Sequence, residues 1–160
     1  MEKTKYILDK IIEMYCIAIM GLMTILVTWQ VFIRYIFNKP NAYTEQISQY
    51  LFVWLVLYGS AYVFGKREHM QISFLRDKSP KWLKNKIDIF QEIIIMIFTF
   101  TVMVYGGYYS SLTQMNQVDA ALQIPIGIIY SAIPISGLFV IFYSVYNIRK
   151  ILFLSKKDKG

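Results

Sequence analysis

Four long stretches of this 160-residue chain contain no Asp, Glu, Lys or Arg, and they limit what the chain can fold into. They are Met14–Ile33, Gln46–Gly65, Ile93–Val118 and Ala120–Ile148, with lengths of 20, 20, 26 and 29 residues. An α-helix needs about 20 residues, mostly apolar, to cross the hydrocarbon core of a bilayer. Because 56% of the chain is hydrophobic, the sequence predicts an all-α membrane protein with four transmembrane helices.

The 17 Lys and Arg residues alternate in their placement between these stretches. Fifteen of them precede the first stretch, follow the fourth, or lie between the second and the third, whereas only Arg34 and Lys39 lie between the first and the second. Cytoplasmic loops carry the excess of Lys and Arg, so both termini are predicted to be cytoplasmic. The net charge of +7 then indicates attraction to lipid headgroups in the bilayer and not nucleic-acid binding.

We expect a single four-helix membrane domain over residues 1–160. Its spans are predicted at about 14–37, 46–65, 90–112 and 124–150. Segments at about 3–13 and 79–87 mix cationic, aromatic and apolar residues, which is typical of amphipathic helices at the membrane interface. Trp82 is expected to anchor the second of these segments, and Pro134 is expected to kink the fourth span.

Ionisable residues at membrane depth are the first candidates for function, because an unpaired charge there costs several kcal/mol. Arg34 ends the first span and Glu45 begins the second, so they face each other across a short hairpin, with Thr44 as the expected N-cap. Two interpretations stay open: an ion pair or partner contact, or Arg34 reaching headgroups while Glu45 only caps its helix. Glu92 is expected in a solvated interfacial position, with proton coupling as the alternative.

Residue types that enzymes and cofactor sites need are sparse in this sequence. Cys16 is the only cysteine and His69, in a loop, is the only histidine. Neither a thiolate metal cluster nor axial haem ligands inside the spans can therefore form. Glycine-rich phosphate motifs and nucleophile motifs are also missing, so we expect no enzyme activity, no cofactor and no metal.

Several short segments, in their order and spacing, resemble one known family. The segments are Gln30–Asn38, Glu45, Tyr50, Trp54, Gly59-Ser60-Ala61, Lys66-Arg67, His69–Ile72, Leu122–Pro125, Tyr130, Ile133-Pro134 and Gly137. They are similar to the small membrane subunit, of the DctQ type, of tripartite ATP-independent periplasmic (TRAP) transporters. This family often has two adjacent acids where the chain has Glu45-Gln46 and often an Asp near Ser73, so Glu45 is left as the candidate partner of Arg34.

The resemblance implies a subunit of the bacterial inner membrane that does not itself bind substrate. It implies a larger membrane subunit as partner, which moves an organic acid in an elevator-like motion driven by a sodium gradient. A periplasmic binding protein would deliver that acid, and a C4-dicarboxylate, a sialic acid or another carboxylate remain open. Lys39, Gln117 and Asp119 are candidate contacts for the binding protein, with ordinary hydrated loop residues as the alternative.

Two other functions compete with a scaffold role. A small self-sufficient exporter would need an acid at mid-depth in the membrane, and the four uncharged stretches contain none. A membrane anchor subunit of a redox complex would need histidines inside its spans. Because apolar spans offer no solvated route for an anion, the sequence favours a scaffold.

Overall fold

The computed structural model describes residues 2–37, 41–66 and 81–157, with the side chains of all but 81–84 and 154–157. The elements are α1 (Glu2–Phe37), α2 (Ala42–Lys66), α4 (Lys81–Phe98), the π-helix η1 (Thr99–Gly106), α5 (Gly107–Gln114), α6 (Ile126–Tyr130) and α7 (Ala132–Lys157). Four stretches are long and apolar enough to cross a membrane, namely Glu2–Phe37, Ala42–Lys66, Asn85–Gln114 and Ile126–Phe153. The predicted all-α architecture with four spans is therefore confirmed for the described residues.

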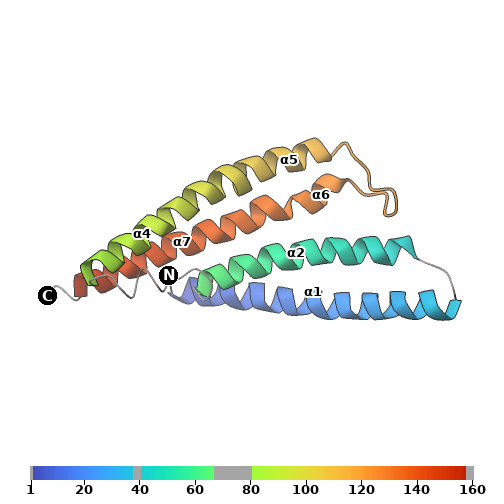
Figure 1. Cartoon of the computed structure of the whole chain (residues 1–160), viewed down its shortest axis with the longest axis horizontal. Helices are drawn as coiled ribbons and strands as arrows, with labels where there is room; N and C mark the ends of the chain where they lie inside the picture. The colour runs from blue at the N-terminus through green and yellow to red at the C-terminus, as the bar shows by residue number, and fades with distance from the viewer. Residues whose placement is uncertain (1, 38–40, 67–80, 158–160) are drawn as a thin grey trace.

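The helices lie side by side in the order α1, α2, α7 and then the continuous α4–η1–α5 helix (Figure 1). We call the end where α1 leads to α2 and α5 leads to α6 the hairpin end. The opposite end, where α1 begins and α7 finishes, is the terminal end. In the most apolar part of each span, 39% of residues are buried in the fourth and only 6% in the first. The fourth span is thus the central helix, and α1 is peripheral.

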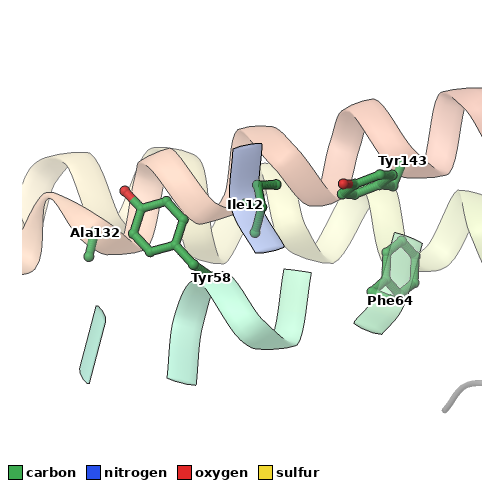
Figure 2. Close-up of a cluster of buried hydrophobic side chains, with 5 residues drawn as sticks. All are labelled: Ile12, Tyr58, Phe64, Ala132 and Tyr143. Atoms are coloured by element: carbon green, nitrogen blue, oxygen red, sulfur yellow. The ribbon is translucent and has the colours of Figure 1, made fainter. Parts of the chain in front are cut away.

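The buried core joins α1, α2 and α7, and Figure 2 shows five of its side chains: Ile12, Tyr58, Phe64, Ala132 and Tyr143. Tyr58 links all three helices through aromatic contacts. Its ring centroid lies 5.2 Å from that of Tyr15 in α1 and 5.7 Å from that of Phe139 in α7. Edge-to-face and tilted ring pairs of this kind stabilise a core beyond their buried area.

Close approach of α2 to α7 depends on Gly65. A Cβ atom at this position would lie 2.6 Å from the ring of Tyr143, closer than real contacts allow. From the sequence, Gly59 was the glycine of α2 expected to allow close helix contact, but a Cβ there would have nothing within 4 Å. The absence of a side chain is therefore needed at Gly65 and not at Gly59.

The third and fourth spans meet at an irregular stretch of both helices. A Cβ on Gly107 would lie 2.8 Å from the side chain of Ile133, and a Cβ on Gly137 would lie 2.9 Å from Met103 Cβ. Met103 belongs to η1, so the π-helix packs against the start of α7. Long π-helices are rare, and no sequence signal was found for this one.

Pro134 interrupts the fourth span one turn before its own position. Proline has no N–H to donate to the carbonyl four residues earlier, and its ring crowds the preceding turn. Accordingly α6 ends at Tyr130 and α7 begins at Ala132, with the chain carried across the break by a bond from Ser131 N to Gly127 O at 3.0 Å. The fourth span is therefore interrupted at Ser131, near the proline, and the expected kink stays a prediction.

The two expected interfacial helices differ from what the structure shows. Residues 3–13 form the first turns of α1 without a break, and residues 81–87 form the first turns of α4. The segment 3–14 contains neither Gly nor Pro, so nothing in it ends the helix. Residues 79 and 80 lie outside the described residues.

Candidate functional site

The hairpin end holds Arg34 and Glu45 at the places that the sequence predicts. Arg34 lies in the last turn of α1 and Glu45 in the first turn of α2, where each charge suits the dipole of its helix. Both side chains are exposed, and within the described part of the chain no ion pair joins them. The geometry leaves both groups available to a partner, and their role as a partner contact stays a prediction.

Asn41, and not Thr44, caps α2. Asn41 Oδ1 accepts a hydrogen bond from Tyr43 N at 3.1 Å, and its carbonyl accepts from Thr44 Oγ1 at 3.0 Å and from Glu45 N at 3.3 Å. The helix begins two residues before Thr44, at Ala42, so Thr44 is already inside the first turn. Asn is among the preferred N-cap residues, and the expectation of Thr44 was wrong by one turn.

Asp119 holds the connection between α5 and α6 to the rest of the bundle. Its Oδ1 accepts hydrogen bonds from Ala121 N at 2.9 Å and Leu122 N at 2.7 Å, and its Oδ2 accepts one from the hydroxyl of Tyr50 in α2. The side chain of Tyr50 and these backbone amides hold the pKa of Asp119 below its usual range. Both carboxylate oxygens of this predicted docking residue therefore bind groups within the chain. Asp119 is also only 8% exposed.

The backbone around Asp119 is also closely organised. Asp119 N donates to Ile124 O and Ile126 N donates to Gln117 O, both at 2.9 Å, which pairs Val118 with Pro125 in an antiparallel bridge. Gln123 has a positive φ of 56°, an uncommon conformation for a residue with a side chain. The connection between α5 and α6 is therefore an ordered turn, held by hydrogen bonds of the Asp119 backbone and side chain.

The structure describes the other predicted site residues, Gln117, Lys39 and Trp82, only in part. Gln117 is exposed at the hairpin end, where a partner could reach it. Lys39 lies outside the described residues. Trp82 falls in the first turn of α4, but its side chain is among those not described. The docking role of Lys39 and Gln117 and the anchoring role of Trp82 stay predictions.

The terminal end carries a polar network that sequence analysis missed. The hydroxyl of Tyr143 in α7 donates to Asp9 Oδ1 in α1 at 2.6 Å, and Lys5 Nζ lies 3.6 Å from Asp9 Oδ2. Lys5 Nζ also lies 5.2 Å from the ring centroid of Tyr146, within range of a cation–π interaction. The alternation of charged and apolar residues at the N-terminus indicated an exposed polar face, whereas one of its acids faces α7.

Glu92 differs from its expected solvated position. It is only 5% exposed in α4, and Ser144 and Asn147 of the adjacent α7 are 0% and 3% exposed. Glu92 also has an interaction partner within the chain. The third and fourth spans therefore bury polar groups near the terminal end, where the sequence pattern indicated only the edge of an apolar span.

The cleft beside α6 is apolar. This cleft of about 310 Å³ lies between the α1–α2 pair and the α6 region. It is lined by Tyr15, Ile47, Tyr50, Leu51, Trp54, Leu122, Ile124, Ile128 and Ile129. None of these lining residues carries a formal charge, so the cleft offers nothing to neutralise an organic anion. Among the described residues there is also no group of three or more His, Cys, Asp or Glu that could hold a metal ion.

Comparisons with known proteins agree with this architecture. Residues 23–154 match the family described as "Tripartite ATP-independent periplasmic transporters, DctQ component". A putative TRAP transporter small permease protein of Haemophilus influenzae is 29% identical over 88% of this chain and 86% of the relative. The sialic acid TRAP transporter small permease protein SiaQ of Vibrio cholerae is 23% identical over 95% of this chain and 89% of its own length.

A third relative is longer. The sialic acid TRAP transporter permease protein SiaT of Haemophilus influenzae is 24% identical over 79% of this chain, which corresponds to 20% of SiaT. In that protein, a segment similar to this chain is part of one larger permease polypeptide.

The family match extends over most of the chain and includes the whole of the second, third and fourth spans and the first span from residue 23 onward. It makes the protein a transport component and not an enzyme, and it argues against both the exporter and the redox-anchor interpretations. Together with the four spans, it places the protein in the bacterial inner membrane as a multi-pass protein. The chain therefore belongs to the DctQ family of small membrane subunits of TRAP transporters.

Proposed function

We propose that this chain is a scaffold that joins a large TRAP membrane subunit and does not itself conduct the substrate. The relative SiaT supports such a pairing, since a segment similar to this chain shares a polypeptide with a larger permease there. The large subunit would take up an organic acid driven by a sodium gradient, and a periplasmic binding protein would deliver the acid. Two relatives are named for sialic acid, which makes a sialic acid the first substrate to test and a C4-dicarboxylate the second.

The observation that carries this proposal is the close packing along the central helix. Gly65 lies against Tyr143, Gly107 against Ile133, and Gly137 against Met103, each without space for even a Cβ atom. A path for a hydrated organic anion needs a polar cavity that can open. Such tight contacts between α2, α7 and the α4–η1–α5 helix leave little room for these helices to move apart. The chain would therefore be a rigid scaffold against which the large subunit moves.

We further propose that the hairpin end faces the periplasm. The support is the distribution of cations, with 15 of the 17 Lys and Arg residues assigned to the opposite side. A fluorescent protein fused after Gly160 should fold and fluoresce, and alkaline phosphatase at the same place should stay inactive. The reverse pair of results would contradict this orientation.

Four polar residues assigned to the hairpin end are the proposed partner contacts. Arg34 and Glu45 are available for the large subunit, and Lys39 and Gln117 for the binding protein. Asp119 would act indirectly, by holding the shape of the turn that presents Gln117.

Co-purification tests the proposal. The chain is produced with the large subunit of its own organism, and only the large subunit carries an affinity tag. Recovery of both in equal amounts from a mild detergent is the expected result. Recovery of the large subunit alone, with the untagged chain folded in the flow-through, would overturn the proposal.

A further inference from the structure

A pocket at the terminal end lies between the first turn of α1 and the last turns of α7. It has a volume of about 360 Å³ and is lined by Glu2, Tyr146, Arg149, Lys150 and Phe153. The proposed scaffold role uses none of these residues. The pocket combines two cations, one carboxylate and two aromatic rings in a chain that spans a membrane.

The depth of the pocket corresponds to the boundary between hydrocarbon and water. The fourth spanning stretch ends at Phe153, so Arg149 and Lys150 lie in its last turns. Phe153 is 74% exposed and the adjacent Leu152 is 54% exposed. Cations at headgroup level beside exposed apolar side chains are the arrangement with which basic pockets of membrane proteins hold lipid headgroups.

The charges of the pocket match a single negative charge. Arg149 and Lys150 contribute two positive charges and Glu2 one negative charge. The adjacent Lys5 is paired with Asp9 and adds no net charge. The lining residues therefore carry a formal net charge of +1, which favours an anionic headgroup over a zwitterionic one.

We propose that this pocket binds an anionic phospholipid. The phosphodiester lies between Arg149 and Lys150, and an acyl chain runs along Phe153. Arg149 also interacts within the chain, and its guanidinium has five N–H donors, so binding a phosphate does not require that interaction to break. Glu2 lies on the rim of the same pocket, where its carboxylate weakens the attraction for the phosphate.

Lipid titration of the full-length protein in detergent, followed by native mass spectrometry, tests this site. Phosphatidylglycerol should bind more tightly than phosphatidylcholine or phosphatidylethanolamine. Each cation near a membrane surface contributes about 1 kcal/mol to attraction of anionic lipid, so Lys150→Gln should weaken phosphatidylglycerol binding about fivefold. The double variant Arg149→Gln, Lys150→Gln should weaken it about 25-fold.

Two further variants separate this site from general attraction. Glu2→Gln should tighten binding, because it removes the one negative charge of the pocket. Lys10→Gln, an exposed cation of α1 outside the pocket, should leave the affinity within about twofold of the unchanged protein. Equal weakening by Lys10→Gln and Lys150→Gln would overturn the proposal, as would preferred binding of phosphatidylethanolamine.

Two competing occupants are also tested. Inorganic phosphate at millimolar concentration should not displace the lipid, since it lacks the acyl chain; displacement would indicate a phosphate site and overturn the proposal. The complex with the large subunit should retain bound phosphatidylglycerol. Loss of the lipid on complex formation would show that a protein segment occupies the pocket and would equally overturn it.

Discussion

The hydroxyl of Tyr143, in the central helix α7, donates a hydrogen bond to Asp9 Oδ1 of the peripheral helix α1 at 2.6 Å. The ring of the same tyrosine packs against Gly65 of α2. One buried side chain therefore joins three helices, by a polar contact with the first and an apolar contact with the second. Tyr143 is 0% exposed, so neither contact can be replaced by water without moving a helix.

Tyr143→Phe should destabilise the bundle while keeping its apolar packing. The change removes the hydroxyl that donates to the Asp9 carboxylate, and a hydrogen bond to a charged group contributes about 1.5–3 kcal/mol to stability. Unfolding in mixed detergent micelles, followed by circular dichroism, measures the loss. Tyr105→Phe, at a tyrosine that is 73% exposed in η1, is the control and should change the free energy of unfolding by less than about 0.5 kcal/mol. Equal losses in both variants would contradict the role of Tyr143.

Gly65→Ala and Gly59→Ala form a matched pair in α2. At Gly65 the added methyl group would lie 2.6 Å from the ring of Tyr143, whereas at Gly59 it meets nothing within 4 Å. Overpacking of this kind costs about 1–3 kcal/mol, and alanine in an unobstructed helix position gains about 0.5–1 kcal/mol over glycine. Thermal unfolding in detergent should show a lower midpoint for Gly65→Ala and an equal or higher midpoint for Gly59→Ala. The opposite order would show that α2 and α7 are not packed as described.

Tyr50→Phe should raise the pKa of Asp119. The hydrogen bond from Tyr50 is the main reason that this pKa lies below its usual range, so its loss moves the pKa upward. A group with a lowered pKa in the folded state stabilises the fold above its unfolded pKa, and this contribution is lost as the pH falls through the folded pKa, here below about pH 4. A carbon-13 NMR titration of the Asp119 carboxyl group measures the shift directly. A titration unchanged by Tyr50→Phe would contradict the contact between α2 and the α5–α6 connection.

Much of this fold could be predicted because burial of apolar groups in a bilayer leaves a strong pattern in the sequence. The uncharged stretches predict the four spans. Pro134 predicts an irregularity in the fourth span, because proline removes a backbone donor wherever it occurs. Local chemistry did not decide that Asn41 is the N-cap of α2. It also did not decide that α1 is continuous, because no residue in its first turns forces the helix to end.

The contacts between helices could not be predicted, because they depend on which faces of the helices meet. Asp9 and Glu92 look like ordinary interfacial acids in the sequence, yet Asp9 contacts Tyr143 and Glu92 is buried in α4, which packs against α7. Asp119 was a reasonable candidate for an exposed loop residue, and only the arrangement of the α5–α6 connection brings it to Tyr50. A contact between residues far apart in the chain produces no periodic pattern in the sequence from which it could be predicted.

Arg34→Gln and Glu45→Gln should weaken assembly without destabilising the isolated chain. Both side chains are exposed and no ion pair between them is formed, so their loss should change the free energy of unfolding by less than about 0.5 kcal/mol. If they contact the large subunit, each variant should reduce the amount of complex recovered through the tagged partner. Unchanged recovery for both variants would contradict the proposed contact. Arg34 and Glu45 would then act only by favourable interaction with the dipoles of their own helices.

The central claim is that the chain supports transport and does not perform it. Uptake of radiolabelled sialic acid into proteoliposomes, with an inward sodium gradient and the cognate binding protein outside, tests this most directly. A C4-dicarboxylate is run in parallel as the second substrate. Vesicles that contain only this chain should take up neither acid, and vesicles that contain this chain and the large subunit should take up one of them. Sodium-dependent uptake by the chain alone would contradict the account.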